Sequence, residues 1–224
     1  MSPNCGPRRG GVLPDIVVLH YTAMISFAAA RDRLCDPASE VSAHYLIDAA
    51  GEVLALVPED LRAWHAGAGA WGGVMDVNSR SVGIELCNTG LHPFPAPQMA
   101  ALARLLRGLM GRWRIPPARV IAHSDMAPGR KADPGPRFDW RALALQGLAV
   151  WPDASAPGQT GDFGADARRF GYPCVDAALL LAAFRLRFRP WAQGPLDATD
   201  AALAADLARR FPVAFAVDGG GPAA

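Results

Sequence analysis

The pattern of hydrophobic and polar positions in the first two thirds of the chain predicts a domain that mixes strands and helices. Short apolar runs rich in β-branched residues are typical of strands buried on both faces of a sheet. Three such runs occur, at residues 15–22, 81–87 and 120–122. Residues 43–48 and 53–57, which flank a turn at Ala50 and Gly51, predict a hairpin.

The longest periodic segment lies between residues 96 and 113. Apolar residues that recur at spacings of three and four indicate a helix with one face in the core, and here they are Met99, Leu102, Leu105, Leu106, Leu109, Met110 and Trp113. Shorter helices are expected at residues 26–34 and 138–146. Because strands alternate with helices, the pattern predicts an α/β or α+β domain, and we expect an α/β fold with a mixed central β-sheet flanked by helices.

The character of the chain changes after residue 152. Small and polar residues dominate the next ten positions, as in a linker. Three amphipathic stretches follow, at roughly residues 165–170, 175–188 and 198–211, and they predict a small all-α three-helix module. We therefore expect three parts: an α/β domain at 1–152, a linker at 153–162 and a helical domain at 163–224.

Composition and charge exclude several classes of partner. The 224 residues are 51% hydrophobic, and a formal net charge of +1 provides no surface potential for a polyphosphate chain, so no nucleic acid is expected. No apolar run approaches the roughly 20 residues that span a bilayer, so no membrane partner is expected either. The apolar stretch at residues 16–19 is too short for the core of a signal peptide, which predicts a cytoplasmic protein.

The four cysteines are far apart and show no CxxC spacing. We expect reduced thiols, since two disulfides would require an oxidising compartment. The basic residues are also unusual, because Lys131 is the single lysine among 22 basic side chains. An ammonium group differs from a guanidinium in shape and reach, so Lys131 is a candidate for a specific role.

Three residues suggest a metal site. His20 and His123 each stand at the end of a predicted buried strand, and Asp133 follows ten residues after His123. Two imidazoles and one carboxylate, with a fourth position left for water, are typical of a hydrolytic zinc site. Each histidine alone is more often structural, and spacing alone does not prove a metal.

A resemblance adds to this reading of the residues. Five motifs occur in the order seen in one family: His20-Tyr21-Thr22, Ser42-Ala43-His44-Tyr45, Trp64-His65-Ala66-Gly67, Gly83-Ile84-Glu85-Leu86, and His123-Ser124-Asp125 followed by Gly129-Arg130-Lys131-Ala132-Asp133-Pro134-Gly135. Over about residues 15–151 they resemble the zinc N-acetylmuramoyl-L-alanine amidases. That fold is shared with phage amidase-type lysozymes and animal peptidoglycan-recognition proteins.

The resemblance implies one zinc ion (Zn2+) per chain and a role for each matching residue. His20, His123 and Asp133 would bind the metal, while Glu85 would move the proton of the attacking water and Lys131 would stabilise the oxyanion. A structural zinc site is disfavoured because no cysteine falls in these motifs.

Two further residues are candidates for substrate binding. His65 either lines the groove that receives the sugar or peptide or orients a neighbouring loop. Asn88, just past the strand that carries Glu85, would hydrogen-bond substrate amides.

The tail shows a weaker resemblance. Residues 169–173 and 182–188 are similar to the three-helix peptidoglycan-binding module of some of these amidases. The alternative is a helical appendage that packs on the first domain or acts as a lid. Either way, the linker composition predicts that a chain cut near Ala156 still folds.

The sequence thus predicts hydrolysis of the amide bond between N-acetylmuramic acid, or its 1,6-anhydro form, and L-alanine in peptidoglycan fragments. A cytoplasmic location favours muropeptides released during cell-wall recycling. Alternatives are an amidase that acts on intact peptidoglycan in the cell envelope and a non-catalytic peptidoglycan-recognition protein. The complete set of five site residues favours an enzyme over the latter, and the oligomeric state stays open.

Overall fold

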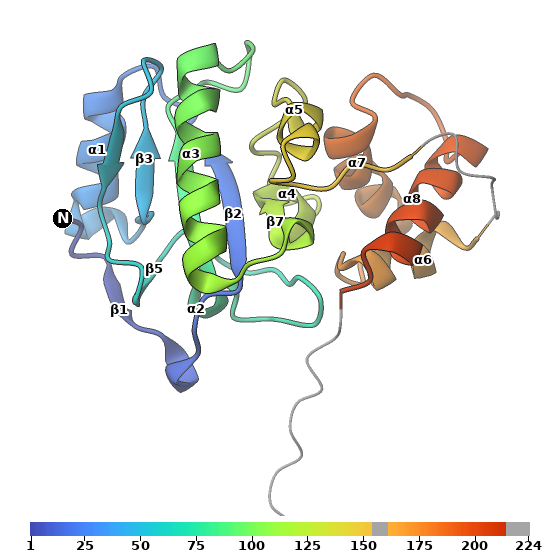
Figure 1. The fold of residues 1–224 in the computed structure, drawn as a ribbon, viewed down its shortest axis with the longest axis horizontal. Helices are drawn as coiled ribbons and strands as arrows, with labels where there is room; N and C mark the ends of the chain where they lie inside the picture. The colour runs from blue at the N-terminus through green and yellow to red at the C-terminus, as the bar shows by residue number, and fades with distance from the viewer. Residues whose placement is uncertain (154–160, 214–224) are drawn as a thin grey trace, which may run out of the picture.

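The computed structural model describes residues 1–153 and 161–213. Its centre is a five-stranded sheet with the order β4-β3-β6-β2-β7 (Figure 1). The strands are β2 (Ile16–Tyr21), β3 (Tyr45–Ile47), β4 (Val53–Ala55), β6 (Ser81–Leu86) and β7 (Val120–Ala122). Neighbouring strands are parallel except at β3 and β4, which form the predicted hairpin. The predicted mixed sheet is confirmed.

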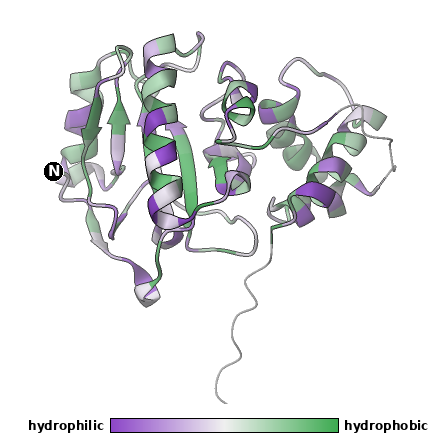
Figure 2. Ribbon diagram, in the orientation of Figure 1, coloured by the Kyte–Doolittle hydropathy of each residue, from purple (hydrophilic) through white to green (hydrophobic). Residues whose placement is uncertain are grey.

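Alternation along the strands separates the two faces of the sheet. On one face, Val17 and Leu19 of β2 pack with Val82 and Ile84 of β6 beneath the long helix α3 (Ala96–Trp113). In Figure 2, β2 is green over most of its length, while α3 carries both purple and green segments, as expected of a helix with one solvent-facing side.

The opposite face of the same strands carries the chemistry. His20 of β2 and Glu85 of β6 are register partners in the parallel pair. Ser81 and Gly83 share the face of Glu85, because they stand four and two positions before it, respectively. Two polar side chains at the carboxyl ends of central parallel strands are therefore adjacent.

Helix α1 (Phe27–Cys35) borders this face. Ser26 begins the helix, since its Oγ accepts a hydrogen bond from the backbone N–H of Ala29. Ala30 and Leu34 bury its inner side against β3 and β4. The helix forms one wall beside the end of β2.

Several short elements were not predicted from the hydrophobic pattern. The strands β1 (Cys5–Pro7) and β5 (Leu61–Ala63) make a separate antiparallel pair, and α2 (Val77–Arg80) and α4 (His123–Met126) are single turns. Single turns of 3-10 helix lie at Arg9–Gly11, Pro37–Ser39 and Pro117–Arg119. Elements of three or four residues are too short to show a period.

The remaining helices are α5 (Trp140–Leu145), α6 (Phe163–Phe170), α7 (Ala177–Phe188) and α8 (Ala198–Arg210). The three predicted C-terminal helices are present. Most of the expected linker lies outside the described residues, so the domain boundaries stay a prediction. One apolar cluster joins the two parts, because Trp71 and Ile121 pack together with Phe170 and Phe184.

No helix in the described ranges is long and apolar enough to cross a membrane. All four cysteines fall within these ranges, and each is a free thiol.

Candidate active site

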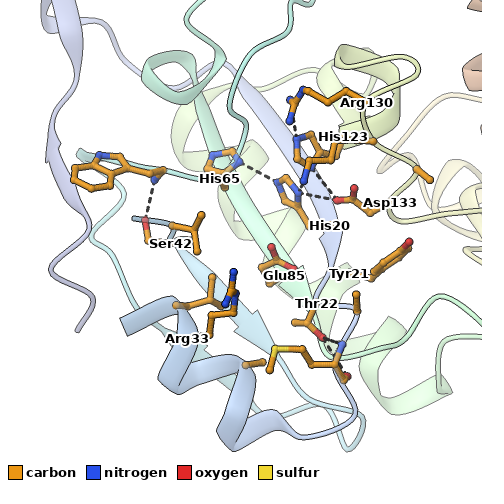
Figure 3. A pocket seen from close by; sticks show the side chains of 18 residues that line it. His20, Tyr21, Thr22, Arg33, Ser42, His65, Glu85, His123, Arg130 and Asp133 are labelled. Carbon is orange, nitrogen blue, oxygen red and sulfur yellow. Dashed lines mark hydrogen bonds and ion pairs between the residues drawn. The ribbon is translucent and has the colours of Figure 1, made fainter. Parts of the chain in front are cut away.

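Three predicted metal ligands converge at the carboxyl end of β2 (Figure 3). The Nδ1 atoms of His20 and His123 lie 2.9 Å apart, and they lie 2.9 and 3.0 Å from Oδ2 of Asp133. All three residues are buried. The structure therefore assembles residues that are separated by more than 100 positions in the sequence.

Each ligand has a distinct origin in the fold. His20 extends from β2, and Asp133 lies in the loop that follows α4. His123 is the first residue of α4, although the sequence pattern places it at a strand end. Asp125 explains the helical turn, because its carboxylate accepts a hydrogen bond from the backbone N–H of Ala122.

The geometry fits a zinc ion. Donor atoms at about 2.0–2.1 Å from zinc in a tetrahedral site lie about 3.3 Å from one another, close to the spacings of the three facing atoms. In addition, Nε2 of His123 lies 2.8 Å from the carbonyl oxygen of Ala66. That carbonyl accepts the ring proton, which leaves the inward Nδ1 of neutral His123 with a free lone pair.

The electrostatics keep His20 and Asp133 in the forms that bind metal. Burial and the adjacent His123 lower the pKa of His20 to about 4, so the imidazole is neutral near pH 7. Burial acts to raise the pKa of Asp133, but hydrogen bonds with His123 and His20 hold it well below its usual value. Neutral imidazoles and an ionised carboxylate are the forms that bind metal.

Glu85 lies beside this cluster on the same face of the sheet. Its Oε2 is buried, and no group in the described ranges donates a hydrogen bond to it. Burial and the negative charge of Asp133 raise the pKa of Glu85 to about 8. A carboxyl with a pKa near neutrality that points into a cavity is a candidate acid/base.

The cluster opens into a cavity of about 400 Å³. His20, His65, Glu85, His123 and Asp133 line it, together with Lys131 and Arg130 from the loop after α4. Lys131 is exposed to solvent at the rim. All five predicted metal and catalytic residues thus face one cavity.

The two predicted substrate-binding residues occupy different places. His65 lines the cavity, and its imidazole also contacts His20. Asn88 is buried, is not among the lining residues, and accepts a hydrogen bond from the backbone N–H of Gly90. A direct role of either residue in binding substrate stays a prediction.

His44 is structural in this fold. Its Nδ1 accepts a hydrogen bond from the backbone N–H of Gly83, and its Nε2 lies 3.1 Å from the carbonyl oxygen of Leu61. Burial lowers the pKa of His44 to about 4.

Sequence reasoning missed two arginines at the cavity. Arg33, from the last turn of α1, lines the wall opposite the metal ligands. Arg130 donates to the carbonyl oxygens of Ala66 and Ala68 and so holds the loop that carries His65. Arg130 belongs to a quoted motif and could have been noticed there, whereas nothing in the sequence distinguishes Arg33 from other helix-surface arginines.

The site has the donor set of a metal-dependent hydrolase, with two imidazoles and one carboxylate around one point. A buried acid lies next to them, at the carboxyl ends of parallel strands, where such sites form. Residues 10–136 match the family model described as N-acetylmuramoyl-L-alanine amidase. The chain belongs to this amidase family.

Individual relatives agree. The chain is 35% identical to N-acetylmuramoyl-L-alanine amidase AmiD of Escherichia coli over 231 residues, which cover 88% of this chain and 83% of AmiD. It is 43% identical to 1,6-anhydro-N-acetylmuramyl-L-alanine amidase AmpD of E. coli over 100 residues, which cover 45% of this chain and 55% of AmpD. The similarity to AmiD therefore reaches into the C-terminal helices.

Solved structures support the same assignment. The complex of E. coli AmiD with anhydro-N-acetylmuramic acid-L-Ala-D-gamma-Glu-L-Lys superposes with a TM-score of 0.80 at 35% identity, covering 91% of this chain and 93% of AmiD. AmpDh3 of Pseudomonas aeruginosa in complex with anhydromuramic pentapeptide gives 0.80 at 32% identity, covering 92% and 96%. Both the fold prediction and the amidase prediction are confirmed.

Proposed function

We propose that this chain is a zinc-dependent amidase that releases the stem peptide from 1,6-anhydro-N-acetylmuramoyl peptides during cell-wall recycling. The observation that carries the proposal is the meeting of His20, His123 and Asp133 beside the buried carboxyl of Glu85. The bound anhydromuropeptides in the AmiD and AmpDh3 complexes support the choice of substrate class.

The proposed roles follow from the chemistry of an amide. Zinc would be held by Nδ1 of His20, Nδ1 of His123 and Asp133, and when bound it supplies Lewis acidity and lowers the pKa of water. Glu85 accepts the proton of the attacking water and returns it to the alanine nitrogen, which is otherwise a poor leaving group. Its position in the apolar strand β6 suits the second step, because a raised pKa leaves a carboxyl able to hold a proton near pH 7. The positive charge of a bound zinc ion would favour the ionised form that the first step needs.

Lys131 has the complementary role. Negative charge develops on the carbonyl oxygen when the amide is attacked, and a cation at the cavity rim stabilises it. Lys131 lines the cavity with Glu85 and Asp133, so its ammonium is within the same chamber as the reacting groups. His65 and Asn88 keep their proposed contribution to substrate binding, in which His65 contacts the substrate from the cavity wall.

Hydrolysis of intact peptidoglycan in the cell envelope is a second candidate. The specific observation in its favour is the C-terminal helical part. Sequence similarity to AmiD extends over 88% of this chain and so includes these helices, whereas similarity to AmpD covers only 45% of it. The proposed division into domains at 1–152 and 163–224, with a linker at 153–162, leaves room for a separate wall-binding role. The four cysteines are widely spaced without CxxC motifs, which favours reduced thiols, and we propose the cytoplasm.

Metal analysis and peptide release test the proposal together. We expect about one zinc per chain, release of the peptide from anhydro-N-acetylmuramic acid-L-Ala-D-γ-Glu-L-Lys, loss of release with a chelator, and recovery with added zinc. Glu85→Gln should retain zinc and lose about 10²- to 10⁴-fold in rate. Undiminished release by the chelated protein would refute zinc dependence.

The substrate pool needs a separate measurement. The rate on the soluble anhydromuropeptide is compared with the rate on purified sacculi, and cell fractionation locates the protein. Faster release from sacculi and an envelope location would favour the second candidate.

A further inference from the structure

The ring of His20 is held from both sides. Its Nδ1 faces the proposed metal position, while its Nε2 lies 3.0 Å from Nδ1 of His65. A neutral imidazole has one ring proton, and a metal-binding nitrogen must have none. The hydrogen-bond role of His65 therefore decides whether Nδ1 of His20 is free to bind.

Ser81 determines that role. Its Oγ lies 2.6 Å from the carbonyl oxygen of Val77 and 3.1 Å from Nε2 of His65. A carbonyl only accepts, so the single hydroxyl proton of Ser81 is donated to Val77. Toward His65, Oγ is then an acceptor, which places the ring proton of His65 on Nε2.

The chain of consequences continues to the metal position. With its proton on Nε2, neutral His65 presents a lone pair at Nδ1. It accepts a hydrogen bond from Nε2–H of His20 and leaves Nδ1 of His20 without a proton. The carbonyl oxygen of Ala66 likewise accepts a hydrogen bond from Nε2–H of His123 and leaves its Nδ1 without a proton. Both histidines would therefore present Nδ1 to the metal.

The fold is built around the position of this ring. A Cβ at Gly83 would lie 2.4 Å from Cγ of His65 and 2.5 Å from its Cδ2, so the imidazole occupies the space that any other residue would fill. Oδ1 of Asn78 also accepts hydrogen bonds from the backbone N–H groups of His65 and Ala66. The ring is fixed by the sheet beneath it and by its own backbone.

We propose that His65 and Ser81 form a relay that fixes the tautomer and orientation of the metal ligand His20. His65 is then a positioning residue that acts through His20, in addition to lining the cavity. The inference rests on the proposed zinc site, but it concerns metal affinity and does not require a particular substrate. Loss of such an outer partner typically weakens metal binding about 10- to 100-fold.

Zinc affinity measured by competition with a chelator tests the relay. His65→Leu should raise the dissociation constant about 10- to 100-fold. His65→Asn should recover most of the affinity, because its amide oxygen stands near the place of Nδ1 and accepts from His20. Equal affinity of His65→Leu and wild type, or equal weakness of the Asn and Leu variants, would overturn the relay.

Gly83→Ala provides an independent route, since the added methyl displaces the ring without altering His65 or a ligand. We expect weaker zinc binding, and no further loss when Gly83→Ala is combined with His65→Leu. Gly6→Ala in strand β1 is the matched control, because a Cβ there meets nothing within 4 Å. Additive losses in the double variant would contradict the proposal.

The wild-type protein gives a test that does not depend on a variant folding. With ¹⁵N-labelled histidine and bound zinc, NMR should show His65 protonated at Nε2 and a coupling across the hydrogen bond from Nε2 of His20 to Nδ1 of His65. A proton on Nδ1 of His65 would refute the relay while the zinc site stands. A wild-type protein that binds no zinc would instead refute the metal centre, and the relay with it.

Discussion

Arg187 and Asp125 form an ion pair that is inaccessible to solvent, with Nη1 of Arg187 2.6 Å from Oδ2 of Asp125. The pair joins α7 of the C-terminal helices to α4, the turn that begins with His123. Tyr172 donates to the other oxygen of Asp125 at 2.6 Å, and the Arg187 guanidinium stacks on Trp140 at 4.1 Å. The C-terminal helices thus supply the charge partner of a residue two positions from a proposed metal ligand.

Arg187→Met should destabilise the protein by about 3–5 kcal/mol, because removal of one partner leaves the buried Asp125 carboxylate without its counter-charge. Urea unfolding of the metal-free protein measures the change. Arg31→Met is the control, since Arg31 pairs with Asp32 and both side chains are exposed, so the loss should stay below about 1 kcal/mol. Equal effects of the two substitutions would show that the buried pair contributes no more to stability than an exposed pair.

A chain ending at residue 153 should be less stable than the full chain, although the linker composition predicts that it folds. The physical reason is the shared core: Trp71 is buried and its ring packs edge-on against Phe170 and Tyr172, at centroid distances of 5.4 and 5.3 Å. Truncation exposes this apolar face and leaves Asp125 unpaired. We expect a lower melting temperature and binding of a hydrophobic dye.

The outcome also separates the roles of the tail. Loss of sacculus binding with unchanged stability and unchanged turnover of soluble substrate would identify an independent wall-binding module. Loss of stability together with altered kinetics on the small substrate would show that the helices support the site.

The parts of the fold that could be predicted are those with a long or strongly apolar pattern. Helix α3 shows its period over 18 residues, and β2 and β6 are nearly continuous apolar runs. The strands β1 and β5 pair across more than 50 positions with three residues each, so their stability comes from tertiary contacts that no local pattern records.

The site shows the same division. Motif resemblance indicated His20, Glu85, His123, Lys131 and Asp133, and the structure brings them to one cavity. Ser81 and Arg187 were not foreseen, because an isolated serine or arginine has no signature until the fold places a partner beside it. Their contacts with His65 and Asp125 span 16 and 62 positions.

Lys131→Arg should impair catalysis while zinc content stays unchanged. The guanidinium is larger and planar, so it cannot present the same compact charge to the developing oxyanion. Loss of one oxyanion donor typically costs about 10²- to 10³-fold in kcat. We expect the loss in kcat of Lys131→Arg to approach the loss in Lys131→Ala. Peptide release from the soluble anhydromuropeptide gives the rates; a fully active arginine variant would reduce Lys131 to a general positive charge at the rim.

The pKa of Glu85 predicts how the stability of the metal-free protein depends on pH. The unfolded carboxyl titrates near 4.5 and the folded one near 8. Between these values the folded state keeps a proton that the unfolded state has lost, so the contribution of Glu85 to stability falls as pH rises, by at most about 1.4 kcal/mol per pH unit. Glu85→Gln, which cannot ionise, should therefore gain stability relative to wild type as pH increases from 5 to 8.

Urea unfolding at pH 5, 6.5 and 8 in the presence of chelator measures this difference, with the exposed Glu52→Gln as the control for removal of one carboxylate. Comparison with Glu85→Gln cancels the titration of the buried histidines, whose lowered pKa values make the protein less stable below about pH 6.5 in both variants. Added zinc should reduce the stability difference between wild type and Glu85→Gln. The double positive charge of the ion beside Glu85 favours the ionised carboxylate. A gap that does not change with pH would mean that Glu85 is ionised in the folded protein throughout this range.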